Sequence, residues 1–136
     1  MLPEHHRDVR ELSPVALAFV GDGVYEVLVR QRLVTETRLP PAKLHSRAVR
    51  FVSAAGQSRI LEFLFPMLTG EEQAVVQRGK NSSKASVAKH ATVQQYRAST
   101  AFEALIGWLY LQYQQERILQ LFEMIWQEFS EEFLAG

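Results

Sequence analysis

The sequence predicts a single all-α domain that extends over residues 1–136. Through most of the chain the apolar residues recur at spacings of three and four, which is the period of one helix face. No pair of alternating apolar runs joined by a short turn indicates a β-hairpin. A composition of 47% hydrophobic and 22% charged residues is that of an ordinary compact domain. The prolines, which break helices, fall only at positions 3, 14, 40, 41 and 66.

The first helix is predicted to begin near Ser13 and to run to about Leu33. The Ser13 hydroxyl can cap the first turn, and Pro14 suits the first helical position. Apolar residues then follow at helical spacing, at Leu17, Val20, Val24 and Leu28.

A second helical pattern covers residues 44–55, after a break at Pro40 and Pro41. A further break at Gly56 is expected to lead into residues 60–65, which Pro66 ends. Thr69 then opens a short helix over residues 70–77, whose first turn is acidic and so suits the helix dipole.

Residues 79–84 are rich in glycine, serine and lysine, and this pattern predicts a polar basic loop. Two last helices follow. One is predicted from Ser99 or Thr100 to about Tyr113, and the other covers residues 116–134. The whole chain is therefore expected to contain six or seven helices and no second domain.

The composition excludes several classes of protein. Because the chain has no cysteine, it has no disulfide, no thiolate zinc site and no cysteine nucleophile, and any metal must be held by oxygen or histidine ligands. Asp22, Glu62 or Glu103 interrupts the longest apolar stretches before they reach the roughly 18 residues that span a bilayer. The first residues also lack the apolar core of a secretion signal, so we expect a cytoplasmic protein.

The 15 basic and 15 acidic side chains balance overall but are distributed unevenly. Residues 73–102 carry no carboxylate, whereas residues 103–136 carry six acidic side chains and one basic one. The first of these segments can bind an anion if folding brings its cations onto one surface. Its five basic residues are Arg78, Lys80, Lys84, Lys89 and Arg97.

Asp22 breaks the local rules for a helix. It lies in the most apolar run of the chain, between Gly21 and Gly23. An interior glycine costs about 1 kcal/mol relative to alanine, and an ionised carboxylate in apolar surroundings costs several kcal/mol, so such a combination is expected mainly at functional positions. The structural alternative is that Asp22 caps a helix beginning at Gly23, or lies on a solvated face with Glu26, which is four residues before Arg30.

Glu103 also allows two interpretations. Thr100 and Glu103 have the spacing of a capping box, in which each side chain satisfies a backbone donor of the other at a helix start. Alternatively, Glu103 points its carboxylate at the same cation as Asp22. Mg²⁺ is typically bound by one or two protein carboxylates together with water and phosphate oxygens, so the two residues are candidate ligands for metal-assisted phosphodiester hydrolysis.

Three segments together resemble the Mini-III ribonucleases, small relatives of ribonuclease III that consist of the catalytic domain alone. The segments are residues 12–30 (LSPVALAFVGDGVYEVLVR), 78–84 (RGKNSSK) and 96–111 (YRASTAFEALIGWLYL). The resemblance implies a ribonuclease III-type fold, an endoribonuclease that leaves 5′-phosphate products, and double-stranded RNA as substrate. It further implies a homodimer that matures the ends of precursor 23S ribosomal RNA, with a ribosomal protein on the precursor as a candidate helper.

By the same resemblance, Asp22 is the catalytic aspartate, Glu103 the metal-binding glutamate, and Mg²⁺ the cofactor, for which Mn²⁺ substitutes. The larger ribonuclease III enzymes carry two further carboxylates, at the positions where this chain has Ala18 and Thr100. The five cations of residues 73–102 are expected to contact RNA phosphates and 2′-hydroxyls, because A-form RNA hides its base edges.

Large apolar residues around Phe19, Val20 and Tyr25 agree with a homodimer. Two alternatives remain at this level. One is a non-catalytic helical RNA-binding or assembly module with the same fold, which the missing carboxylates at Ala18 and Thr100 favour. The other is a purely structural helical dimerisation domain that does not bind RNA.

Overall fold

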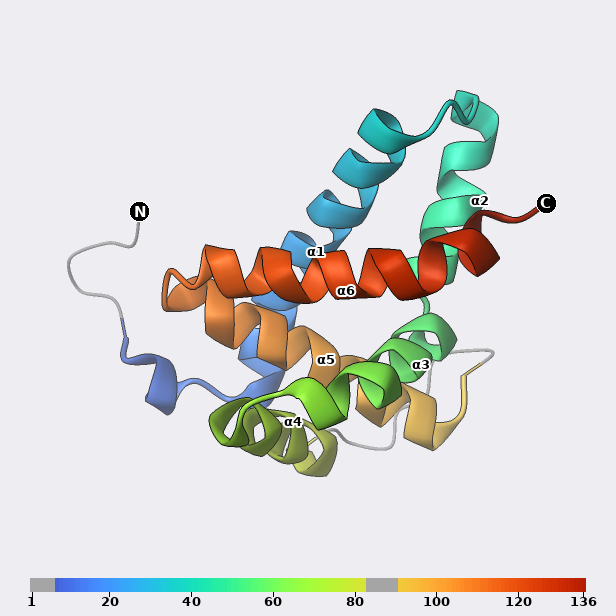
Figure 1. Ribbon diagram of the computed structural model, residues 1–136. Helices are drawn as coiled ribbons and strands as arrows, with labels where there is room; N and C mark the ends of the chain where they lie inside the picture. The colour runs from blue at the N-terminus through green and yellow to red at the C-terminus, as the bar shows by residue number, and fades with distance from the viewer. Residues whose placement is uncertain (1–6, 83–90) are drawn as a thin grey trace.

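The computed structural model describes residues 7–82 and 91–136, and within these residues it contains helices and no strand. The predicted all-α fold is therefore confirmed. Figure 1 shows the six α-helices, which two short 3-10 helices accompany. In chain order the elements are η1 (Val9–Glu11), α1 (Pro14–Glu36), α2 (Pro41–Val52), α3 (Ala54–Leu64), η2 (Phe65–Met67), α4 (Gly70–Ser82), α5 (Val93–Leu111) and α6 (Gln115–Leu134).

Helix α1 begins as the sequence predicts and ends three residues later than expected. The Ser13 hydroxyl accepts a hydrogen bond from the backbone N–H of Ala16 at 3.1 Å, and Pro14 occupies the first turn. The helix runs without a break through the two glycines that flank Asp22. The expectation that Asp22 caps a helix beginning at Gly23 is thus wrong, because Asp22 lies in a helix interior.

The break between α2 and α3 falls at Ser53 and not at Gly56. The Ser53 hydroxyl caps α3 by accepting a hydrogen bond from the Gly56 N–H at 3.1 Å. Gly56 is required for a different reason, since a Cβ atom there would lie 2.0 Å from the carbonyl oxygen of Arg50. Pro41 begins α2, and Pro66 lies within η2.

Helix α4 is longer than predicted. The pattern over residues 79–84 indicated a loop, but residues 79–82 continue the helix, and residues 83 and 84 lie outside the described residues. Gly79 packs against α5, where a Cβ atom would come within 2.7 Å of the Cα atom of Ala101. Gly79, which the sequence pattern placed in a loop, therefore allows the close contact between α4 and α5.

Helix α5 starts well before the predicted Ser99 or Thr100. Thr92 is its N-cap and forms a capping box with Gln95, in which each of the two hydrogen bonds measures 3.0 Å. Thr100 lies inside the helix and donates its hydroxyl to the carbonyl oxygen of Tyr96. The predicted capping box of Thr100 and Glu103 is therefore wrong, and Glu103 projects from a helix interior. Helix α6 matches its prediction to within one residue.

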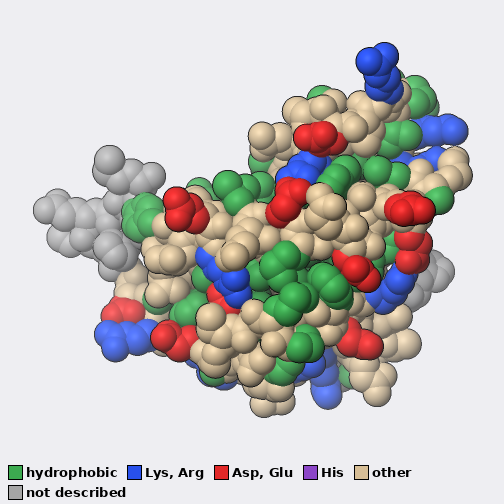
Figure 2. Space-filling view, in the orientation of Figure 1, with side chains coloured by type: hydrophobic (Ala, Val, Ile, Leu, Met, Phe, Trp, Pro, Cys, Tyr) green, Lys and Arg blue, Asp and Glu red, His purple; other side chains and the backbone are tan. Residues whose placement is uncertain are grey.

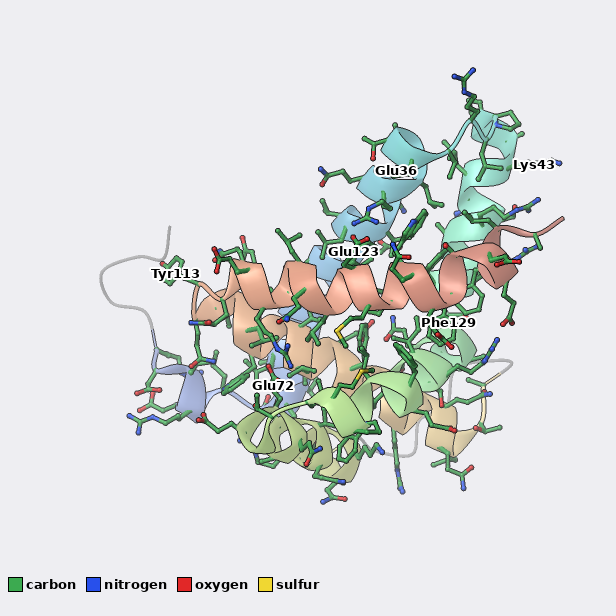
Figure 3. All side chains as sticks on the ribbon, viewed as in Figure 1. Glu36, Lys43, Glu72, Tyr113, Glu123 and Phe129 are labelled. Atoms are coloured by element: carbon green, nitrogen blue, oxygen red, sulfur yellow. The ribbon has the colours of Figure 1, made fainter. Side chains whose placement is uncertain are left out.

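Helix α5 occupies the centre of the fold, where it packs against α1, α3 and α4 (Figure 1). Helix α6 lies across the front of the molecule and is tied to both sides of it. Its Phe129 meets Phe63 of α3 edge to face, with 5.7 Å between the ring centres. Its Arg117 donates two hydrogen bonds of 2.8 Å to the buried Glu72 at the start of α4. Phe129 and Glu72 are labelled in Figure 3. The Arg117 guanidinium lowers the pKa of Glu72.

No helix in the described parts of the chain combines the length and apolar composition that crossing a bilayer requires.

Gly21 of α1 and Gly107 of α5 let the backbones of these two helices touch. A Cβ atom on Gly21 would lie 1.7 Å from the carbonyl oxygen of Glu103, and one on Gly107 would lie 1.9 Å from that of Leu17. Real Cβ atoms essentially never come closer than 3.0 Å to such a neighbour, so the crossing requires glycine at both positions. The crossing brings the residue after Gly21, Asp22, to the same level as Glu103.

The two glycines beside Asp22 make a matched test of this contact. Gly21→Ala is expected to lower the free energy of unfolding by about 3 kcal/mol, because backbone must move to admit the methyl group. Gly23→Ala meets nothing within 4 Å and is expected to raise it by up to about 1 kcal/mol through helix propensity. Urea unfolding followed by circular dichroism measures both, and equal effects would contradict the close crossing.

Candidate active site

The carboxyl groups of Asp22 and Glu103 meet where α1 crosses α5. Asp22 is exposed to solvent, whereas Glu103 is partly buried. The two side chains lie close enough that both the charge of Asp22 and a hydrogen bond between the carboxyl groups act on Glu103. Two groups that are distant in the sequence thus form one acidic site with an open side at Asp22.

This environment favours the protonated form of the Glu103 carboxyl group. Burial raises the pKa of Glu103 to about 8, and the charge of Asp22 acts in the same direction, followed by a smaller effect of Glu26. Glu26 itself pairs with Arg30 at 3.6 Å, as its spacing predicts. A carboxyl group that is buried beside another carboxylate is stabilised in its ionised form when a cation is bound between them.

Gln57 is a member of the site that the sequence analysis missed. Its side-chain amide donates hydrogen bonds to the Glu103 carboxylate at 3.2 Å and to the carbonyl oxygen of Val52 at 3.0 Å. Its only sequence signal is a polar residue in the first turn of an otherwise small and apolar segment. The hydrogen bond to Glu103 favours the ionised form, which opposes the effects of burial and of Asp22.

Tyr25 forms the apolar wall behind Glu103. Its ring is fully buried and meets Phe102 edge to face at 4.8 Å, and its hydroxyl donates to the carbonyl oxygen of Phe51 at 3.0 Å. Burial, with a smaller effect of the Glu103 charge, raises the pKa of Tyr25. The expectation that Tyr25 belongs to an apolar surface for dimerisation is therefore wrong, since it belongs to the core.

The donor set at the crossing fits a hard divalent cation. Within residues 7–82 and 91–136 no group of three or more histidine, aspartate or glutamate side chains is arranged to hold a metal. Two carboxylates in contact nevertheless suffice for Mg²⁺, which takes its remaining ligands from water and substrate phosphate. Ala18 and Thr100, one turn before Asp22 and Glu103 respectively, are both buried and add no carboxylate.

Two of the predicted RNA-binding residues share one surface hollow. Lys80 of α4 and Arg97 of α5 line a depression of about 500 Å³ together with Glu62. The Lys80 ammonium lies 5.7 Å from the centre of the Phe65 ring. Arg78 is exposed on α4 and does not line this hollow. The other two predicted residues, Lys84 and Lys89, lie outside the described residues.

An all-α fold with an acidic pair at a helix crossing agrees with a metal-dependent nuclease, and the comparisons with known proteins show which class it is. The family model for the ribonuclease III domain matches residues 15–114. A crystal structure of a protein from Fusobacterium nucleatum superposes with a TM-score of 0.81 at 28% identity and covers 90% of this chain and 98% of its own. Enzymes of the ribonuclease III family generally use divalent metal ions and act on double-stranded RNA.

Curated relatives specify the branch of that family. The Mini-ribonuclease 3 of Brevibacillus brevis is 45% identical over 85% of this chain and 86% of its own length. The Mini-ribonuclease 3 of Enterococcus faecalis is 40% identical over 85% of this chain and 89% of its own. The chain belongs to the Mini-ribonuclease 3 branch of the ribonuclease III family. The predictions of this family and of an endoribonuclease are confirmed, and the two non-catalytic alternatives are not supported.

The raised pKa of Glu103 predicts how the free energy of unfolding depends on pH. Above the pKa of about 4.5 of an unperturbed glutamate, the unfolded chain releases a proton that the folded chain retains up to about pH 8. Stability that Glu103 contributes at low pH is therefore lost as the pH rises through this window. Glu103→Gln, which is permanently neutral, is expected to stabilise the metal-free protein at pH 8.5 by more than about 1 kcal/mol, the equivalent of one pKa unit, and by much less at pH 4.5.

Urea unfolding at several pH values in the presence of a chelator measures this difference. Glu128→Gln, which removes an exposed carboxylate of α6, is the matched control and is expected to leave the pH dependence unchanged. A difference between Glu103→Gln and the parent protein that does not grow with pH would contradict the assigned environment of Glu103.

Proposed function

We propose that the chain hydrolyses double-stranded RNA with a Mg²⁺ ion held by Asp22 and Glu103, and that its natural substrate in the cytoplasm is precursor 23S ribosomal RNA. The observation that carries the proposal is the contact between these two carboxyl groups, one of which is exposed to solvent. The names of the curated relatives and the oxygen donors at the site support it.

A bound Mg²⁺ or Mn²⁺ ion supplies Lewis acidity toward a phosphate oxygen. The chain itself provides the geometry. Asp22 would hold the cation from the open side, where a phosphate of the substrate can approach, and Gly23, which has open space beside it, leaves room for that approach. Glu103 would hold it from the buried side, with its carboxylate oriented by the hydrogen bond from Gln57. In-line attack of water on phosphorus would form the new P–O bond as the P–O3′ bond breaks, and the 3′ oxygen would take up a proton, which leaves a 5′-phosphate and a 3′-hydroxyl.

RNA binding is assigned to the basic residues of α4 and α5. Lys80 and Arg97 line one hollow, and Arg78 lies exposed on the same helix as Lys80. Arg97 precedes Glu103 by six residues of α5, which is about 9 Å along the helix axis. Figure 2 shows acidic side chains spread along α6, with basic side chains among them, so α6 is not the basic surface to which RNA binding is assigned. Contacts of Lys84 and Lys89 with RNA remain part of the proposal.

A homodimer is proposed from the apolar surface of α1. Phe19 is 85% exposed and protrudes from this helix. About two turns further along α1, Val27 lines an apolar groove together with Tyr110 and Leu119. A protruding aromatic ring and a groove on the same helix suit a two-fold interface in which each copy offers both. Two active sites in such a dimer cut one strand each, and a ribosomal protein on the precursor can add affinity.

Asp22→Asn tests the cation site directly. The variant keeps the shape of the side chain and removes its charge, so cleavage of a labelled RNA duplex in Mg²⁺ is expected to slow at least about 100-fold. Glu36→Gln, at the far end of α1 (Figure 3), is the matched control and is expected to cut at the parent rate. Undiminished cleavage by Asp22→Asn would refute the assigned role of Asp22.

Charge reversal tests the RNA surface. Lys80→Glu and Arg97→Glu are each expected to weaken duplex binding and to reduce the salt dependence of the binding constant by about one phosphate contact. Lys43→Glu on α2, which lies away from α4 and α5 (Figure 3), is the control. Fluorescence anisotropy over a range of KCl concentrations measures the slopes, and identical slopes for the parent and both variants would exclude this surface.

A further inference from the structure

Gln57 is a buried side chain that connects the acidic site to the joint between α2 and α3. Its residue is only 1% exposed, and its amide reaches two different helices. We propose that Gln57 is a positioning residue that fixes the Glu103 carboxylate in the orientation in which it binds the divalent cation together with Asp22. This inference rests on the proposed function of the acidic site.

The hydrogen bonds of Gln57 determine which way its amide faces. Both contacts, to Glu103 Oε2 at 3.2 Å and to the Val52 carbonyl oxygen at 3.0 Å, are with oxygens that accept. Only the NH₂ end of the amide can serve both partners, because the carbonyl end has no proton to donate. Gln57 therefore uses its two protons to link a helix-end carbonyl to the carboxylate.

The oxygen end of the amide indicates that Gln57 is not present for packing alone. Gln57 Oε1 is buried and has no hydrogen-bond partner among the described residues. An unsatisfied buried acceptor destabilises the folded state, and an apolar side chain of the same size would avoid this penalty. A position chosen for packing alone would favour methionine or leucine. The two hydrogen bonds that the amide donates, to the Val52 carbonyl oxygen and to Glu103, explain why the residue is polar.

The backbone under Gln57 is fixed on both sides. Ser53 caps the first turn of α3, and the close approach of Gly56 to the Arg50 carbonyl oxygen locks this turn against the end of α2. Val52 is the last residue of α2, where helix carbonyls lack partners within the helix. The amide is therefore anchored to a rigid joint, and its second proton transmits that rigidity to Glu103 on α5.

Direct cation binding separates positioning from packing. Isothermal titration of the full chain with Mn²⁺ alone gives a dissociation constant that does not depend on catalysis. Gln57→Met keeps the volume and removes both donors, and the dissociation constant is expected to rise about 10-fold or more, as for other residues that orient a metal ligand. In cleavage assays the same variant is expected to need correspondingly more Mn²⁺ for half-maximal rate, with an unchanged KM for RNA at saturating metal.

Gln73→Met is the matched control. It removes another amide that donates to a backbone carbonyl oxygen, that of Phe65 at 2.9 Å, and that forms no hydrogen bond with Glu103 among the described residues. Its Mn²⁺ affinity is expected to equal that of the parent. Gln57→Asn provides a second test in a milder variant, because its shorter side chain cannot bridge Val52 and Glu103 together, and the dissociation constant is expected to rise again.

The variant Glu103→Gln distinguishes a failure of this inference from a failure of the proposed function. If Glu103→Gln abolishes Mn²⁺ binding and the folded Gln57 variants bind as the parent does, the positioning role is overturned and the cation site stands. If Glu103→Gln binds Mn²⁺ as the parent does, the cation site itself is overturned, and the inference falls with it. An equal loss of affinity in Gln57→Met and Gln73→Met would also overturn it, since that pattern reports general destabilisation.

Discussion

The backbone contact between α1 and α5 is the constraint on which the rest of the molecule depends. Gly21 and Gly107 each leave the space of one methyl group, and the carbonyl oxygens of Glu103 and Leu17 fill it. Interior glycines each cost about 1 kcal/mol in helix propensity, so the packing gained at the crossing must offset them. The same contact puts the residue after Gly21 beside Glu103. The core and the acidic site are therefore two results of one helix crossing.

The acidic site lowers the stability of the metal-free fold when both of its carboxyl groups are ionised. Burial and the neighbouring Asp22 both raise the pKa of Glu103, which means that the ionised pair is disfavoured without a cation. The site is backed by packed aromatic rings, since Tyr25 and Phe102 meet edge to face at 4.8 Å. A pair of carboxyl groups that disfavours its own charges is suited to a cation, since a bound cation removes the repulsion between them.

The sequence predicts the features that local chemistry determines, and it fails where tertiary contacts decide. The start of α1 at Ser13 and Pro14 and the whole of α6 follow from capping and periodicity. The start of α5 does not, because the spacing of Thr100 and Glu103 imitates a capping box while the true one uses Thr92 and Gln95. Asp22 and Glu103 are detectable because they break or imitate local rules. Gln57 breaks none, and its role exists only once α3 meets α5.

The buried Ala18 and Thr100 explain why a neutral residue is suited to hold Glu103. These are the positions at which the resemblance to larger ribonuclease III enzymes places two further carboxylates, and here neither side chain adds charge. Each added carboxylate would repel Glu103 and raise its pKa further, so more cationic charge would be needed to keep the site ionised. An amide donor acts in the opposite direction, because it orients the carboxylate while favouring its ionised form. A site with two carboxylates and a donor thus needs less positive charge to assemble than a site with four carboxylates.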